Sequence, residues 1–79
     1  MKFSITVVLK KDVLEPQGKV IEQTLKNMGM NTLTSLRQGK YFEINIDEKT
    51  ESVALKKIDD MCQKLLVNLI IEDYNIKKI

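Results

Sequence analysis

The sequence has no histidine and no tryptophan, and only one cysteine (Cys62) and one proline (Pro16) in 79 residues. Without histidine, the usual Ser-His and Cys-His nucleophile arrangements and ordinary zinc sites are excluded. A single cysteine excludes an internal disulfide. So short a chain buries only roughly 60–65% of its unfolded surface. Oligomerisation is the remaining way to stabilise it, and we expect a homodimer or larger.

Arginine and aromatic side chains are scarce as well. Arg37 is the only arginine among 13 basic residues, and the formal charge is +2. Phe3 and Phe42 fall on apolar faces, which leaves Tyr41 almost alone as an exposed aromatic, whereas single-strand binders need several. No apolar run approaches the length of a membrane span. We therefore predict a cytoplasmic protein that binds neither nucleic acid nor membrane.

Two segments near the N-terminus have clear periodicity. Apolar residues alternate with polar ones from Phe3 to Leu9, which predicts a half-buried strand. A helix is predicted from Pro16 to a left-handed cap at Gly29. Its apolar stripe consists of Val20, Ile21, Leu25 and Met28.

Residues 32–47 carry a second strand pattern, and two interpretations stay open. One is a hairpin of two strands with a tight turn at Gln38-Gly39. The other is a single strand with a glycine bulge. Residues 50–66 form a second amphipathic helix, and residues 70–79 a last strand. The apolar positions of this second helix are Ala54, Leu55, Ile58, Met61, Cys62 and Leu65.

The predicted order is β-α-β-β-α-β in one domain, residues 1–79. An antiparallel sheet with two helices on one face is a two-layer, ferredoxin-like α+β sandwich. That fold has many unrelated functions, so function has to be inferred from sites.

No catalytic or metal-binding constellation emerges. Cys62 lies on an apolar helix stripe and is predicted to be a buried core residue. Asp59 and Asp60 are adjacent on a helix, so their side chains diverge. The pair Gly18-Lys19 lacks the earlier glycine and the following hydroxyl of a phosphate loop. We therefore predict no catalytic residue, no metal site and no cofactor bound by this chain.

Three stretches of the sequence together resemble the motifs of one known family. Leu14-Glu15-Pro16-Gln17-Gly18-Lys19 resembles "L-D-P-Q-G-K". Arg37-Gln38-Gly39-Lys40-Tyr41 is similar to "R-x-G-K". Residues 61–74 resemble "M-C-x-K-L-L-x-N-P-x-I-E-D-Y". The family that these motifs resemble is PurS, the small subunit of phosphoribosylformylglycinamidine synthase. Leu69 replaces the usual proline, so we expect Asn68 to end the helix in a left-handed conformation.

The resemblance implies a noncatalytic subunit of de novo purine biosynthesis. A glutaminase subunit would release ammonia from glutamine, and a large synthetase subunit would use ATP and magnesium to consume it. A dimer of PurS-like chains would bridge the two. In the absence of any catalytic group, this is the function that the sequence favours.

The two glycine motifs supply the candidate partner contacts. Gly18 lies in the first helical turn, where glycine permits close approach of another backbone, either within the fold or at a subunit boundary. Arg37 and Lys40 flank Gly39. The predicted interface residues are Gly18, Lys19, Arg37, Gly39, Lys40 and Tyr41.

Two alternative functions remain open from the sequence. One is a small-molecule-binding regulatory domain of the same α+β type, which ligand-dependent thermal stabilisation would reveal. The other is an RNA-binding module, which would show salt-dependent binding to single strands.

Overall fold

The computed structural model describes all residues from 1 to 79 and contains three strands and two helices. The elements are β1 (Lys2–Leu9), α1 (Pro16–Asn27), β2 (Gly39–Asn45), α2 (Glu51–Met61) and β3 (Glu72–Lys78). A single π-helical turn, η1 (Cys62–Leu66), continues α2. The class is α+β with an antiparallel sheet and two helices, as predicted.

The sheet has the strand order β2-β1-β3, with β1 antiparallel to both neighbours. In β1, Phe3, Ile5 and Val7 point to one face, because side chains alternate along a strand. Ile5 is paired with Phe42 on one side and with Ile76 on the other. These residues therefore form an apolar face across all three strands.

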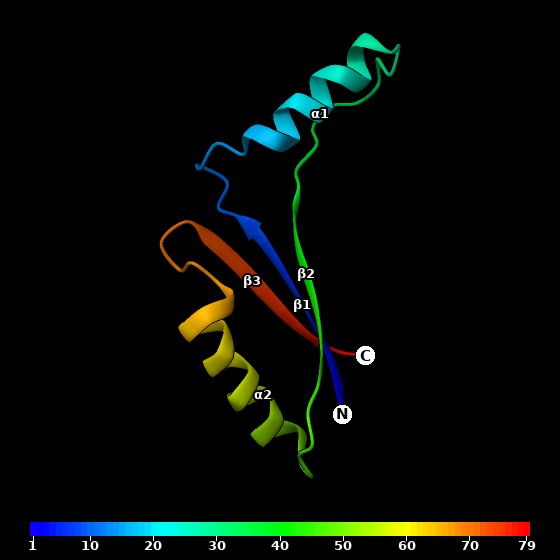
Figure 1. The fold of residues 1–79 in the computed structure, drawn as a ribbon. Coiled ribbons are helices and arrows are strands. Elements are labelled where there is room, and N and C mark those ends of the chain that lie inside the picture. The colour runs from blue at the N-terminus through cyan, green and yellow to red at the C-terminus, as the bar shows by residue number, and fades with distance from the viewer.

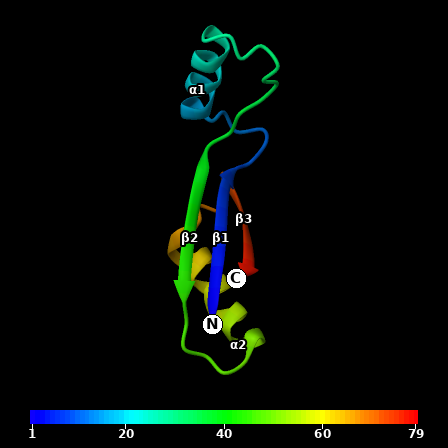
Figure 2. The ribbon, with the colours of Figure 1, turned by 90° about the vertical axis from the view of Figure 1, so that its right-hand side faces the viewer.

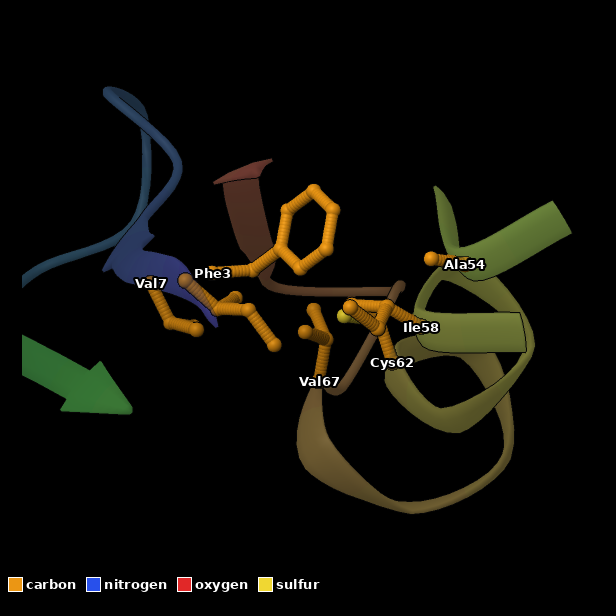
Figure 3. Close-up of a cluster of buried hydrophobic side chains, with 7 residues drawn as sticks. Phe3, Val7, Ala54, Ile58, Cys62 and Val67 are labelled. Atoms are coloured by element: carbon orange, nitrogen blue, oxygen red, sulfur yellow. The ribbon is translucent and has the colours of Figure 1, made fainter. Parts of the chain in front are cut away.

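Helix α2 covers this face of the sheet (Figure 2). Ala54, Ile58 and Cys62 of α2 and η1 meet Phe3 and Ile5 in a core where each of these side chains is 0% exposed. Figure 3 shows the cluster, with Val67 closing it at the end of η1. The core is small and consists of a single cluster of seven buried residues.

The predicted apolar face of the second helix is right for Ala54, Ile58 and Cys62, whereas Met61 is 39% exposed. The amide of Val67 donates to the carbonyl oxygen of Cys62, five residues back, at 2.9 Å. This wider turn rotates the following side chains, so Leu65 is 84% exposed whereas Val67 is buried. The left-handed conformation predicted for Asn68 is wrong, since no residue other than glycine has a positive φ.

Residues 32–47 contain one strand and no hairpin. Strand β2 begins at Gly39 and pairs with β1 in unbroken register through Asn45. Residues 33–38 have no regular secondary structure, because they lie beyond the end of β1 and have no neighbouring strand to pair with. The single-strand interpretation is correct, although without a bulge in the pairing, and the hairpin is wrong for this chain.

Helix α1 lies off the sheet, which departs from the prediction of two helices on one face. Residues 10–38, which we call the arm, project from the sheet and α2, which we call the body (Figure 1). The segment after Gly29 runs back along α1 to reach β2 (Figure 1). Gly29 has φ +100°, so the predicted left-handed cap is confirmed. The only buried residue of the arm is Gly18.

Candidate partner interface

The two glycine motifs of the sequence meet where the arm joins the body. Glu15 is the N-cap of α1, and its carboxylate accepts from the amide of Gly18 at 2.5 Å. The same oxygen, Oε2, accepts from the amide of Gln38 at 3.4 Å. A hydrogen bond from Gln38 Nε2 to Gln17 Oε1, 2.7 Å long, lies beside it. Residues far apart in the sequence thus form one polar junction.

Gly18 is required by this junction. A Cβ atom at this position would overlap the Glu15 carboxylate and would lie 3.1 Å from the carbonyl oxygen of Leu36. Of the two explanations that the sequence left open for this glycine, the close approach within the fold is the one observed. Gly39 is similar, since a Cβ atom there would overlap the carbonyl oxygen of Val7 on the neighbouring strand.

The charged residues predicted for partner contact are partly engaged within the chain. Arg37 donates through Nη2 to the carbonyl oxygens of Leu9 and Lys10. Lys40 pairs with Glu72 at 3.3 Å. An amide hydrogen bond from Asn68, together with Lys40, holds the pKa of Glu72 below its usual range. Lys19 makes no ion pair in the structure.

Two shallow hollows lie at the junction. Lys19 and Arg37 line the larger one, of about 350 Å³, and Gly39 and Lys40 line the smaller, of about 180 Å³. Glu15 contributes to both. Five of the six predicted interface residues are therefore brought together. The sixth, Tyr41, lies apart on the face of the sheet that α2 does not cover. It is 57% exposed, and its hydroxyl donates a hydrogen bond to Glu43 Oε1 at 3.3 Å.

Two acidic residues of this region were not predicted to have a role. The family motif includes Glu15 without indicating a cap, and no motif includes Glu22. Glu22 accepts from the amide of Leu36 at 2.9 Å, and this bond is the main reason why its pKa lies below the usual range. An acidic residue three positions before a glycine in the first helical turn was the available signal for the cap at Glu15.

One face of α1 is apolar and uncovered. The apolar stripe predicted for this helix includes Val20 (66% exposed), Ile21 (41%) and Met28 (67%). Leu14 and Met30 at the two ends of the helix are exposed as well. An apolar hollow of about 370 Å³ lies on this side, lined in part by Pro16, Val20 and Ile21.

The reactive groups of the chain do not converge. Cys62 is buried, and burial together with the charge of Asp59 raises the pKa of its thiol. The structure brings together no group of three or more cysteine, aspartate or glutamate side chains that would hold a metal ion. None of its helices has the length and hydropathy needed to cross a membrane. Of its aromatic side chains, Tyr41 is the exposed one, and Phe42 and Tyr74 are half-buried.

The fold and this junction define a class: a small α+β protein whose prominent feature is an uncovered surface rather than a pocket of reactive groups. A sequence profile of the PurS family, described as phosphoribosylformylglycinamidine (FGAM) synthase, matches residues 2–79. The PurS subunit of Methanocaldococcus jannaschii is 34% identical over 96% of this chain and 92% of its own length. That of Bacillus subtilis is 38% identical over 92% of this chain and 86% of its own.

Solved structures agree with the sequence comparison. A chain in the structure of PurLQS from Thermotoga maritima superposes with a TM-score of 0.93 at 28% identity, over 99% of this chain and 95% of that one. The crystal structure of Methanocaldococcus jannaschii PurS, described as a subunit of formylglycinamide ribonucleotide amidotransferase in the purine biosynthetic pathway, gives 0.88 at 36% identity, covering 96% and 92%. This chain belongs to the PurS family of FGAM synthase subunits, and the predicted ferredoxin-like fold class is confirmed.

Proposed function

We propose that this chain is a noncatalytic subunit of FGAM synthase that, as a homodimer, bridges the glutaminase and synthetase subunits. Membership of the PurS family supports the assignment to the enzyme. The Thermotoga maritima relative is part of a PurLQS structure, which supports association with other subunits. The observation that carries the bridging role is the amount of surface that the isolated chain leaves uncovered.

The accessible surface of the chain is 5964 Å². A compact protein of this mass exposes about 4,900 Å², so the chain exposes about 1,000 Å² more. Obligate dimers bury about 1,000–2,500 Å² per partner. The excess therefore has the size of a permanent subunit interface.

The shape of the chain leads to the same conclusion. Its radius of gyration is 16.0 Å and it extends 50 Å along its longest axis. A compact chain of this length has a radius of gyration of about 12 Å. The difference comes from the arm, which keeps an apolar helix face in water. Exposed apolar surface on this scale is characteristic of an interaction site.

A second copy of the chain is the first occupant that we propose for the apolar face of α1. Burying about 1,000 Å² of surface that includes the apolar face of α1 would compensate for a core of seven residues. Val20→Asp should therefore lower the association state in sedimentation equilibrium. Val53→Asp is the matched control, because Val53 is 43% exposed on α2 in the body. A folded wild-type monomer at micromolar concentration would contradict the homodimer.

The remaining parts of the proposal concern the chemistry. ATP, magnesium and glutamine would be used by the synthetase and glutaminase subunits, and this chain would bind none of them. The state of the only thiol supports assigning the glutamine chemistry to another subunit, since Cys62 is buried and its pKa is raised, which disfavours the nucleophilic thiolate. A cytoplasmic location is part of the proposal, because a free thiol suits a reducing compartment.

The experiment is a reconstitution of the three subunits. Synthetase and glutaminase are mixed with and without this chain, and either glutamine or ammonia is supplied. If the chain bridges the two, omitting it abolishes glutamine-dependent synthesis and leaves ammonia-dependent synthesis intact, because holding two sites together is an effective-concentration effect. Equal glutamine-dependent rates in both mixtures would refute bridging. Loss of the ammonia-dependent rate would show instead that the chain activates the synthetase directly.

A further inference from the structure

The arm is attached to the body by two chain segments and by very little packing. Figure 2 shows the segments, one leaving β1 and the other entering β2. No apolar side chain of the arm is buried, so no hydrophobic contact of the kind seen beneath α2 holds the arm in place. What holds the arm is a set of polar contacts. Lys10, its first residue, donates its amide to the carbonyl oxygen of Ile71 at 2.8 Å and pairs with Asp73 at 3.6 Å. The remaining contacts form what we call the neck clasp. Its side chains are those of Glu15, Gln17, Glu22, Arg37 and Gln38.

Arg37 connects the arm to the body. Its Nη2 donates to the carbonyl oxygens of Leu9 and Lys10, the latter at 3.2 Å, at the point where β1 ends and the arm begins. A guanidinium is planar and its N–H groups have fixed directions. An arginine that reaches two successive carbonyls therefore restrains the segment that enters β2 relative to the strand beside it.

The two carboxylates connect the parts of the arm to each other. The Glu15 carboxylate accepts from the amides of Gly18 and Gln38. Glu22, about two turns further along the same face of α1, accepts from the amide of Leu36 at 2.9 Å. Hydrogen bonds to charged groups are stronger than those between neutral groups. The helix is thus fixed to the segment that Arg37 fixes to the body.

We propose that the neck clasp sets the direction of the arm relative to the body, with Arg37 and Glu15 as positioning residues. The proposal rests on the proposed self-association, because the direction of the arm decides which surfaces of two copies meet. It assigns Arg37 an internal role in place of the partner contact predicted from the sequence. The shape of the relatives supports a fixed direction: a freely hinged arm would not superpose over 99% of the chain with a TM-score of 0.93 at 28% identity.

The test measures the direction of α1 directly. Residual dipolar couplings of backbone amides are recorded for the full chain in its native association state, for wild type, Arg37→Gln and Glu15→Gln. Lys19→Gln and Asp12→Asn are matched controls, because they remove the same charges from the same hollow without removing a hydrogen bond of the clasp. Sedimentation equilibrium is run on every sample.

In wild type, α1 and the sheet should fit one common alignment tensor. In both clasp variants the sheet amides should still fit, while the α1 couplings shrink and leave the common fit. The Leu36 amide should exchange with solvent about 10-fold or more faster in Glu22→Gln, because a hydrogen bond to a charged group is weakened. The two control variants should behave as wild type.

Couplings of α1 that still fit the common tensor in both clasp variants would overturn the proposal. So would an equal loss of fit in the controls, since the effect would then be one of charge alone. A monomeric wild type in the sedimentation experiment would refute the proposed homodimer, yet the couplings would still report on the clasp. The failure of one proposal is therefore distinguishable from the failure of the other.

Discussion

Replacing Gly18 by alanine should destabilise this protein, although the same change stabilises most helices. In an ordinary helix, alanine is favoured over glycine by about 0.5–1 kcal/mol. Here the new Cβ atom would overlap the Glu15 carboxylate, which accepts from the Gly18 amide at 2.5 Å, and would lie 3.1 Å from the carbonyl oxygen of Leu36. The carboxylate has to move, and the helix cap is lost with it.

The magnitude follows from these contacts. Loss of an N-cap costs about 0.5–2 kcal/mol. Loss of the second hydrogen bond of the same carboxylate, to Gln38, costs about 1 kcal/mol, because that bond is long. Subtracting the helix-propensity gain leaves a net loss of about 0.5–2.5 kcal/mol.

The assay is urea unfolding followed by circular dichroism at one fixed protein concentration, since association contributes to the apparent stability. The midpoint should fall with little change in the slope. A double-mutant cycle with Glu15→Ala isolates the cause. In that background the overlap with the carboxylate is absent, so Gly18→Ala should be neutral or slightly stabilising. A higher midpoint for Gly18→Ala alone, or an equal cost in both backgrounds, would refute the reasoning.

Three further predictions concern the body and the acidic side chains. Ile58→Ala should lower the stability by about 2–5 kcal/mol in urea unfolding, because Ile58 is 0% exposed in the core. The Cys62 thiol is buried and its pKa is raised, so it should react slowly with a disulfide reagent in the native protein and rapidly in urea. Glu22 and Glu72 have lowered pKa values in the folded state, so their contribution is complete above the ordinary glutamate pKa of about 4.3 and is lost as the pH falls through the folded values. The urea midpoint of the double variant, Glu22→Gln with Glu72→Gln, should therefore fall less than that of wild type between pH 6 and pH 3.

The strand and helix types were predictable because they depend on short-range periodicity. Alternation from Phe3 to Leu9 fixes which side chains of β1 share a face, and the structure buries Phe3, Ile5 and Val7. A spacing of four residues places Ala54, Ile58 and Cys62 on one face of the second helix, and the structure buries all three. Periodicity shows that a face is apolar, and in these two elements the covering surface belongs to the same chain.

The same reasoning did not place α1 correctly, because periodicity identifies an apolar face but does not show which surface covers that face. Val20, Ile21 and Met28 form a regular stripe, yet they are exposed in this chain. Leu36 lies in an apolar pattern typical of a strand, but strand formation requires a neighbouring strand, and β1 has already ended. Gly18, Arg37 and Gly39 of the junction were singled out through motifs, whereas Glu22 was missed because its partner is an amide 14 positions away.

The sequence alone therefore determined the types of the main elements, the buried positions Phe3, Ile5, Ala54, Ile58 and Cys62, the absence of histidine chemistry and the family resemblance, because each of these depends on residue identity and close spacing. Only the tertiary structure decided that residues 10–38 leave the body, that Arg37 bonds to the end of β1 and that the Gln38 amide donates to the Glu15 carboxylate. These features depend on contacts between segments about 20 or more residues apart. Such contacts form only after the chain has turned back on itself, and no spacing within one segment encodes them.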